Sequence, residues 1–201
     1  MTRLLLARHG NTTGNSAERF WGRTDVALSD EGTSQAERLR DRLATEKITA
    51  VYCSQLRRAR STAEIIAAAH NLPVTICEEL LEINFGQAEG MTFNEIGQRF
   101  PEIMKSWPTR DLNFSYPGGE SMGEMYSRVS QFPKRLENHA LEDTVLIVAH
   151  AGVIRLLLCH LLKLEPFHWR QFRTDLASLS IIDGYPQTPV LTLFNDVCHL
   201  M

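Results

Sequence analysis

The sequence predicts a three-layer α/β/α sandwich around a mainly parallel central sheet. Short apolar runs alternate along the chain with segments whose apolar residues recur at helical spacing. Most of these runs are continuously apolar, as strands buried on both faces are, rather than alternating in polarity. The chain contains no internal repeat, linker or composition break, so we expect a single domain over residues 1–201.

The individual elements follow from local signals. Apolar runs predict strands at residues 3–7, 48–53, 74–77 and 144–149, and two more at 179–183 and 190–194. The turn at 184–189 is rich in Gly and Pro, which favours an antiparallel hairpin between the last two strands. Ser29 can cap a helix whose first turn is acidic. Helices are expected at 29–43, 56–70, 92–100, 121–136 and 151–162, and residues 11–28 are expected to form a loop.

Composition excludes several classes of function. The net charge of −3 gives no overall basic field for nucleic acid or acidic lipid. The four cysteines are scattered without zinc spacing and indicate core positions in a reducing compartment. The most apolar stretch, residues 152–162, is too short to span a bilayer, and no signal peptide is evident. We expect a cytoplasmic protein without nucleic-acid or membrane partners. The sequence is also compatible with a homodimer.

Two histidines share one local setting. His9 follows a predicted strand directly and precedes Gly10, and His150 follows another strand just before Gly152. In parallel α/β sheets, ligands bind outside the carboxyl ends of the strands. Either histidine alone is explained most simply by a structural role at the sheet edge. Together, and with Arg8 beside His9, they favour a functional site.

Charged residues follow two further strand ends. Arg57, Arg58 and Arg60 open a predicted helix, where the helix dipole disfavours cations unless an anion binds there. An exposed basic turn paired with surface acids is the alternative explanation. The segment after the third strand carries several carboxylates, namely Glu79, Glu82 and Glu89.

These segments together resemble the histidine phosphatase superfamily. Residues 8–15 resemble its R-H-G-x-T-x-x-N signature, and residues 54–63 resemble its S-x-L-x-R-A-x-x-T-A segment, which places the matching arginine at Arg58. Residues 82–86 are similar to its E-x-x-x-G segment and residues 148–155 to its second-histidine motif. The resemblance runs in order through nearly the whole chain and implies the phosphoglycerate mutase-like fold.

The resemblance also implies catalytic roles. His9 would be the nucleophile that forms a phosphohistidine, and Glu82 would give a proton to the leaving alkoxide. The phosphoryl oxygens would be held by Arg8, Asn15, Arg58 and His150. Arginines would then neutralise the charge, so the interpretation requires no metal and no cofactor. The expected partner is a small-molecule phosphate ester.

Two alternatives belong to other classes of protein. A metal hydrolase could use His9, His150 and Glu82, but the sequence has no close-spaced ligand pair such as H-x-H or H-E-x-x-H. A catalytically inactive binding module on the same fold is expected to have lost His9, Glu82 or a phosphate-binding arginine, and all of these are present.

The substrate is the least determined part of the interpretation. Residues 15–22 resemble a loop of the phosphoglycerate mutases of the family and place Trp21 and Gly22 near the leaving group. Against a mutase, the chain lacks the long basic insertion of those enzymes. Residues 116–121 and 150–162 are similar to the small phosphatases, including α-ribazole phosphatases of cobalamin synthesis. We expect α-ribazole 5′-phosphate as the substrate, with a mutase or a phosphoserine phosphatase as alternatives.

Aromatic residues support that choice. The segment between Phe85 and Glu120 would cover the leaving group, and flat apolar contacts suit a nucleoside-like group better than a small acid. Its aromatic residues are Phe93, Phe100, Trp107, Phe114 and Tyr116.

Overall fold

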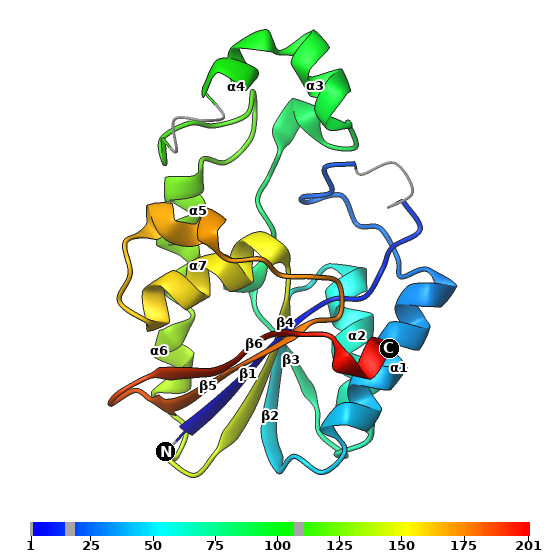
Figure 1. Ribbon diagram of the computed structural model, residues 1–201, viewed down its shortest axis with the longest axis vertical. Coiled ribbons are helices and arrows are strands. Elements are labelled where there is room, and N and C mark those ends of the chain that lie inside the picture. The colour runs from blue at the N-terminus through cyan, green and yellow to red at the C-terminus, as the bar shows by residue number, and fades with distance from the viewer. Residues whose placement is uncertain (1, 15–18, 107–110) are drawn as a thin grey trace.

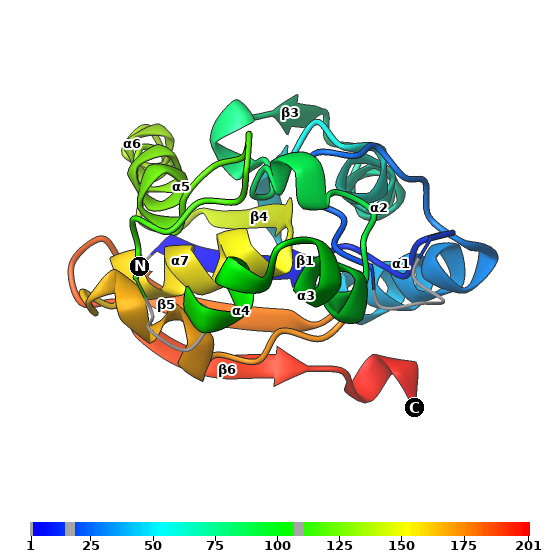
Figure 2. The ribbon, with the colours of Figure 1, turned by 90° about the horizontal axis from the view of Figure 1, so that it is seen from above.

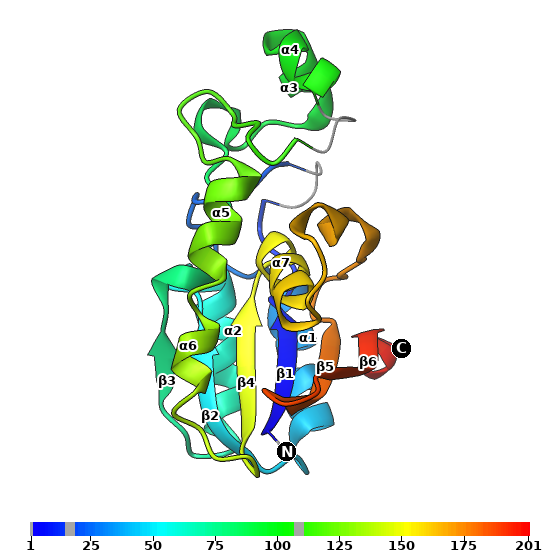
Figure 3. The same ribbon diagram turned by 90° about the vertical axis from the view of Figure 1, so that its left-hand side faces the viewer.

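The computed structural model describes residues 2–14, 19–106 and 111–201 of the chain. Within these residues, the centre is a six-stranded sheet of order β3-β2-β4-β1-β5-β6, which Figure 3 shows from left to right. The strands are β1 (Thr2–Arg8), β2 (Ile48–Cys53), β3 (Val74–Ile76), β4 (Thr144–Ala149), β5 (Leu179–Tyr185) and β6 (Val190–Asp196). The first four are mutually parallel, whereas β5 is antiparallel to both β1 and β6. The prediction of a mainly parallel sheet with one hairpin is confirmed.

Helices cover both faces of this sheet, which confirms the three-layer prediction. Seen from above, the two groups lie on opposite sides (Figure 2). One face carries α1 (Asp30–Leu43) and α2 (Arg57–Ala68), and the other α5 (Met122–Val129), α6 (Pro133–Leu136) and α7 (Ala151–Leu161). Successive side chains of β1 alternate between the two cores: Leu4 and Leu6 pack on the α7 side, Leu5 and Ala7 on the α2 side. β1 is therefore buried on both faces at the middle of the molecule.

A proline divides one of the predicted helices, and another proline follows the end of a second. The expected helix at 121–136 is instead α5 and α6, because Pro133 has no N–H to donate and can only begin a helix. The expected helix at 92–100 is α3 (Phe93–Arg99), after which Pro101 starts α4 (Pro101–Ser106). Phe100 before that proline is not helical, as the proline ring requires. α3 and α5 both begin with a capping box.

A small cap stands over the carboxyl ends of the strands. We define the cap as residues 85–106 and 111–121; it includes α3, α4 and the short 3₁₀ turn η3 (Gly86–Ala88), and it lies at the top of Figure 1. It has an apolar cluster of its own, in which Ile96, Ile103 and Tyr116 are buried. Phe20, from the predicted loop at 11–28, packs against this cluster. The cap thereby forms a lid of aromatic residues above the sheet edge where ligands bind in α/β folds.

Three further 3₁₀ turns complete the described chain. They are η2 (Glu78–Leu80), η5 (Pro166–Gln171) and η6 (Cys198–Leu200). η5 packs against α7, so it lies beside the carboxyl end of β4. The sequence predicted no element there, because six residues starting at a proline carry no apolar periodicity.

Candidate active site

His9 and His150 lie side by side at the carboxyl ends of neighbouring strands. β1 and β4 pair in parallel with Arg8 opposite Ala149, so the residue that follows each strand end is a histidine. The two ring centroids are 5.1 Å apart in an edge-to-face arrangement. Both residues are buried. The structure thus brings together two side chains that the sequence separates by most of the chain.

A single hydrogen bond selects the tautomer of His9. Its Nδ1 lies 2.8 Å from the carbonyl oxygen of Gly10. A carbonyl oxygen can only accept, so Nδ1 carries the hydrogen and donates it. In a neutral imidazole this leaves the lone pair on Nε2. Nε2 is therefore the ring nitrogen that can act as a nucleophile.

The surroundings keep both imidazoles uncharged. Burial lowers the pKa of His9 well below its ordinary value, and the cations Arg8 and Arg58 lower it further. Burial likewise lowers the pKa of His150, with smaller contributions in the same direction from Arg58, His9 and Arg8. A neutral His9 is the form that can attack an electrophile at pH 7.

His150 has unused hydrogen-bonding capacity. Neither of its ring nitrogens bonds to any residue in the described part of the chain, although the residue is fully buried. Leaving a buried polar group unpaired costs about 1–3 kcal/mol. His150 is also the N-cap residue of α7, so it stands where backbone N–H groups begin to point toward the site. An oxyanion bound beside His9 would satisfy this ring.

Arg8 is fixed against the site by the chain after η5. Its Nη1 donates to the carbonyl oxygen of Thr174 at 2.7 Å. Its buried Nε makes no hydrogen bond within the described residues. Burial lowers the pKa of Arg8 to about 10, while the carboxylates of Glu82 and Asp175 oppose that shift. Arg8 is half-buried, and its guanidinium is a cation at neutral pH whose charge acts on both histidines.

Arg58 is the arginine of the α2 start that enters the site. It is 1% exposed. Arg57 instead pairs with Asp25, with Nε 3.3 Å from Oδ2. Arg60 pairs with Glu64 at 2.8 Å on the helix surface. Arg57 and Arg60 are therefore paired with nearby acids, as the alternative explanation of the basic turn proposed. The explanation that the turn binds an anion is supported only for Arg58.

A turn at residues 21–24 holds the Arg58 guanidinium. Arg58 Nη2 donates to the carbonyl oxygens of Gly22 (2.7 Å) and Trp21 (3.3 Å), and Nη1 to that of Thr24 (2.8 Å). These neutral acceptors orient the cation without cancelling its charge. Arg58 therefore still offers positive charge to an anion.

The side chain of Glu89 fixes the 21–24 segment through hydrogen bonds. Its carboxylate accepts from the backbone amides of Gly22 (3.1 Å), Arg23 (2.8 Å) and Thr24 (3.1 Å), and from the hydroxyl of Thr24 (2.6 Å). It also accepts from the amide of Phe85 at 3.0 Å. A carboxylate with this many donors has little capacity left to exchange protons with a substrate. Glu89 therefore has a structural role.

Glu82 is hydrogen-bonded to the start of α7, two residues after His150. It is buried, and its Oε1 and Oε2 accept from the amides of Ile83 (3.0 Å) and Gly152 (3.2 Å). Arg23 donates to its backbone carbonyl at 2.8 Å. Glu79 points elsewhere, to an ion pair with Arg135 at 2.9 Å. Of the three carboxylates that the sequence offers, Glu82 is the one that lines the cavity described next.

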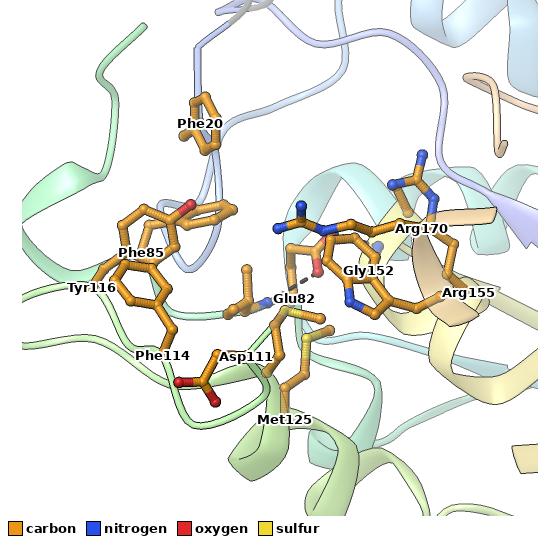
Figure 4. Close-up of a pocket in the computed structure, with 14 residues that line it drawn as sticks. Phe20, Glu82, Phe85, Asp111, Phe114, Tyr116, Met125, Gly152, Arg155 and Arg170 are labelled. Atoms are coloured by element: carbon orange, nitrogen blue, oxygen red, sulfur yellow. Dashed lines mark hydrogen bonds between the residues drawn. The ribbon is translucent and has the colours of Figure 1, made fainter. Parts of the chain in front are cut away.

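A cavity of about 260 Å³ opens beside Glu82 (Figure 4). One wall is aromatic and contains Phe20 together with three residues of the cap, namely Phe85, Phe114 and Tyr116. In Figure 4 this wall faces Arg155 and Arg170 across the cavity. The remaining lining residues are Glu82, Ile83, Asp111, Met122, Met125, Ala151, Gly152 and Trp169. The cavity has the size and composition for an organic group, and Glu82 is part of its lining.

Some of the residues expected around the leaving group do not line the cavity, and one residue that was not expected does. Phe20 lines the cavity, whereas Trp21 turns away and donates its indole N–H to Gly14 at 3.0 Å. Gly22 contributes its backbone to the Arg58 turn. Phe93 is exposed and Phe100 packs within the cap, so neither lines the cavity. Two expected residues, Asn15 and Trp107, lie outside the described residues.

Sequence reasoning missed one wall of the cavity. Arg155 is the last residue of the segment 148–155, but the sequence analysis assigned it no function. Because it follows Gly152 by three residues, it lies on the same face of the helix, and this spacing could have indicated its position in the site. Trp169 and Arg170 come from η5, whose position depends on packing against α7. Asp111 had no sequence signal that we can identify.

In the residues described here, no three His, Cys, Asp or Glu side chains gather in a way that could hold a metal ion. None of the described helices is long and apolar enough to cross a bilayer.

Comparison with known proteins places this geometry in context. A sequence profile of the histidine phosphatase superfamily (branch 1) matches residues 4–197. Phosphoserine phosphatase 1 of Hydrogenobacter thermophilus is 32% identical over 200 residues, which cover 100% of this chain and 95% of that protein. Phosphoglycerate mutase-like protein 4 of Arabidopsis thaliana is also 32% identical, covering 98% and 86%. The crystal structure of the alpha-ribazole phosphatase from Shigella flexneri superposes with a TM-score of 0.88 at 32% identity, covering 96% of each chain.

Proposed function

Because this chain belongs to branch 1 of the histidine phosphatase superfamily, we propose that it hydrolyses a small phosphate monoester through a phosphohistidine on His9. One observation carries the proposal. His9 is a buried, neutral imidazole whose Nδ1 hydrogen is held by Gly10, and it stands next to His150, where the positive charges of the half-buried Arg8 and the buried Arg58 act on it. A pre-aligned nucleophile among anion-binding groups is what phosphoryl transfer requires.

In the first step, Nε2 of His9 attacks phosphorus as the bond to the ester oxygen breaks. The negative charge on the phosphoryl oxygens is stabilised by Arg8, Arg58 and His150, which are oriented before substrate binds. Glu82 gives its proton to the leaving oxygen, so the alcohol departs neutral into the cavity. The enzyme is left with a phosphohistidine and an ionised Glu82.

In the second step, water takes the place of the departed alcohol. The Glu82 carboxylate removes a proton from this water while its oxygen attacks phosphorus and the bond to His9 breaks. Inorganic phosphate leaves, and both His9 and Glu82 return to their starting protonation states. The two arginines supply the positive charge that a metal ion would otherwise give, and we therefore propose that the reaction is metal-independent.

The aromatic wall of the cavity supports a bulky, flat leaving group. Phe20, Phe85, Phe114 and Tyr116 form a chain of edge-on ring contacts, with centroids 5.0 to 5.5 Å apart between Phe20 and Phe85, Phe85 and Tyr116, and Phe114 and Tyr116. Such rings gain from contact with another π-system. We propose α-ribazole 5′-phosphate, and with it a role in cobalamin synthesis in the cytoplasm, as the preferred reaction. The α-ribazole phosphatase neighbour supports this choice.

The deciding experiment compares the candidate reactions directly. The protein is assayed with α-ribazole 5′-phosphate, O-phosphoserine and 4-nitrophenyl phosphate, and isomerisation of 3-phosphoglycerate is measured in parallel. We expect kcat/KM to be highest for α-ribazole 5′-phosphate. Isomerisation faster than every hydrolysis would make the chain a mutase, and a clear preference for phosphoserine would assign it to that class of phosphatase.

A further inference from the structure

Two arginine side chains hold the backbone on either side of Glu82. Arg128 of α5 donates from Nη1 to the carbonyl oxygens of Leu81 (2.8 Å) and Glu79 (2.9 Å), which precede Glu82. Arg23 donates from Nε to the carbonyl oxygen of Glu82 itself at 2.8 Å. The two guanidinium groups therefore fix the peptide groups from which the Glu82 side chain extends.

Both guanidinium groups meet the carboxylate of Glu120. Arg128 donates to it through two hydrogen bonds, from Nε to Oε1 at 3.0 Å and from Nη2 to Oε2 at 2.9 Å. Nη2 of Arg23 lies 3.6 Å from Oε2. A guanidinium that makes two hydrogen bonds to one carboxylate is fixed in orientation as well as in distance. One acidic side chain therefore orients the arginines that hold the Glu82 backbone.

Glu120 is also bonded directly to the chain that follows Glu82. Its amide donates to the carbonyl oxygen of Asn84 at 2.8 Å, and its Oε2 accepts from the amide of Asn84 at 3.3 Å. The side chain of Glu120 is only 14% exposed, so water has little access to replace these bonds. The end of the cap is thus fastened to both sides of Glu82.

The geometry points to an indirect role for Glu120. It is not among the described residues that line the cavity, whereas Glu82 is. Both of its carboxylate oxygens already accept hydrogen bonds from Arg128. It can therefore act on a substrate only through the residues that it holds.

We propose that Glu120 is a positioning residue for the proton donor: through the two arginines it keeps the Glu82 carboxylate within reach of the departing ester oxygen. The inference rests on the proposed phosphohistidine chemistry, in which Glu82 protonates the leaving group. A proton donor must lie within hydrogen-bond reach of the atom that it protonates. Because the amide of Gly152 holds the carboxylate end of Glu82, Glu120 supplies the matching restraint at the backbone end.

Two esters with flat leaving groups test this role. Benzyl alcohol departs only when it receives a proton, whereas nitrophenolate departs without one. Glu120→Gln keeps the size of the side chain and removes its charge. We expect kcat for benzyl phosphate to fall about 10- to 100-fold with KM little changed, as for misplacement of a catalytic group by about 1 Å. The kcat for 4-nitrophenyl phosphate should change much less.

A double variant shows whether Glu120 acts through Glu82. In the Glu82→Gln background, Glu120→Gln should cause no further loss of activity on benzyl phosphate, because the group that it positions is already absent. Additive losses would overturn the proposal. Arg23→Gln removes only the bond to the Glu82 carbonyl and should show the same selective loss, which keeps the test valid if Glu120→Gln does not fold.

Glu79→Gln is the matched control. Glu79 pairs with Arg135 at 2.9 Å beside the same 3₁₀ turn, and this ion pair makes no hydrogen bond to residues 81–84 within the described ranges. The control should leave the ratio of the two kcat values unchanged, and urea unfolding of each variant measures the effect on stability. Equal losses on both esters in Glu120→Gln would mean a structural role only and would overturn the proposal.

The single variant Glu82→Gln separates this inference from the proposed function. If Glu82→Gln slows both esters equally, Glu82 is not the proton donor, and the proton-transfer step of the proposed function fails together with the role of Glu120. If Glu82→Gln is selective for benzyl phosphate and Glu120→Gln is not, only the positioning role is wrong.

Discussion

Gly152 and Glu82 are coupled at the start of α7: the amide of Gly152 donates to Oε2 of Glu82 at 3.2 Å, and a Cβ on residue 152 would lie 2.5 Å from Oε1. The same Cβ would approach Met125 Cε at 3.1 Å. Both atoms are ends of flexible side chains, so the fold can accommodate alanine there while the carboxylate cannot keep its place. Residue 152 therefore controls the position of the Glu82 carboxylate, the proposed proton donor.

Gly152→Ala should reduce catalysis according to the leaving group. We expect kcat/KM for an alkyl phosphate to fall by about 100-fold, the lower range for loss of a general acid, and that for 4-nitrophenyl phosphate to fall much less, because nitrophenolate departs without a proton. Glu82→Gln should show the same pattern. The double variant should be little worse than Glu82→Gln alone, and additive losses would show that Gly152 acts elsewhere.

His9→Ala should abolish hydrolysis of every ester, because it removes the imidazole that we propose as the phosphoryl acceptor. Rapid denaturation of the wild-type protein during turnover of labelled substrate should trap acid-labile phosphate on His9. His150→Gln keeps His9 and should still form the phosphoenzyme, although slowly. Normal turnover by His9→Ala would remove the nucleophile assignment.

Glu89→Gln should slow all substrates alike. The amide can accept with one oxygen only, so part of the support for the turn at 21–24 is lost, and with it the placement of Arg58. We expect kcat/KM to fall about 10-fold for alkyl and aryl esters equally, together with a loss of about 1–3 kcal/mol in the free energy of unfolding. Glu95→Gln in the cap is the matched control. A loss confined to alkyl esters would mean that Glu89 exchanges protons.

The buried histidines should make the protein less stable in acid. An unfolded imidazole has a pKa near 6.5, and burial lowers the pKa of both His9 and His150 in the folded chain. Below about pH 6.5 the unfolded chain binds more protons than the folded chain, so stability present above that pH is lost as the pH falls. The expected loss is up to about 1.4 kcal/mol per pH unit for each histidine. Urea titrations between about pH 7 and pH 5 give the free energy of unfolding at each pH. Its dependence on pH should be weaker for His150→Gln than for wild type, and equal dependence would contradict a lowered pKa for His150.

Treatment with a chelator should leave hydrolysis of 4-nitrophenyl phosphate unchanged, because Arg8 and Arg58 neutralise the phosphoryl charge. The measurement is the initial rate before and after dialysis against EDTA, with Mg²⁺, Mn²⁺ and Zn²⁺ added back singly. Loss of activity that a divalent ion restores would favour the metal-hydrolase alternative.

Much of the fold could be predicted because its signals are local. Continuous apolar runs identified the strands. Because ligands bind at the carboxyl ends of parallel strands, the sequence also predicted that His9 and His150 belong to one site. The basic start of α2 showed that an arginine was relevant, and only the family resemblance selected Arg58. Its neighbours Arg57 and Arg60 have the same local sequence setting but different partners in space.

The rest of the site depends on packing between distant segments. Phe20 rather than Trp21 lines the cavity because Phe20 packs against the apolar cluster of the cap. η5 reaches the cavity only because it packs on α7. Glu89 was one of three equivalent acids in the sequence. Its five donors come from two loops, and no spacing rule predicts such an arrangement.

The position of β1 in the sheet has a consequence for synthesis on the ribosome. β1 is translated before the other strands of the sheet, yet both of its neighbours, β4 and β5, begin at residues 144 and 179. The nascent chain must therefore carry an unpaired apolar strand until most of the protein has been made, and this exposes it to chaperones and to aggregation. Joining β1 to β4 also closes a very long loop, which makes this a slow, late event in folding. A chain whose synthesis stops before residue 144 carries His9 without His150 and so contains only part of the candidate site.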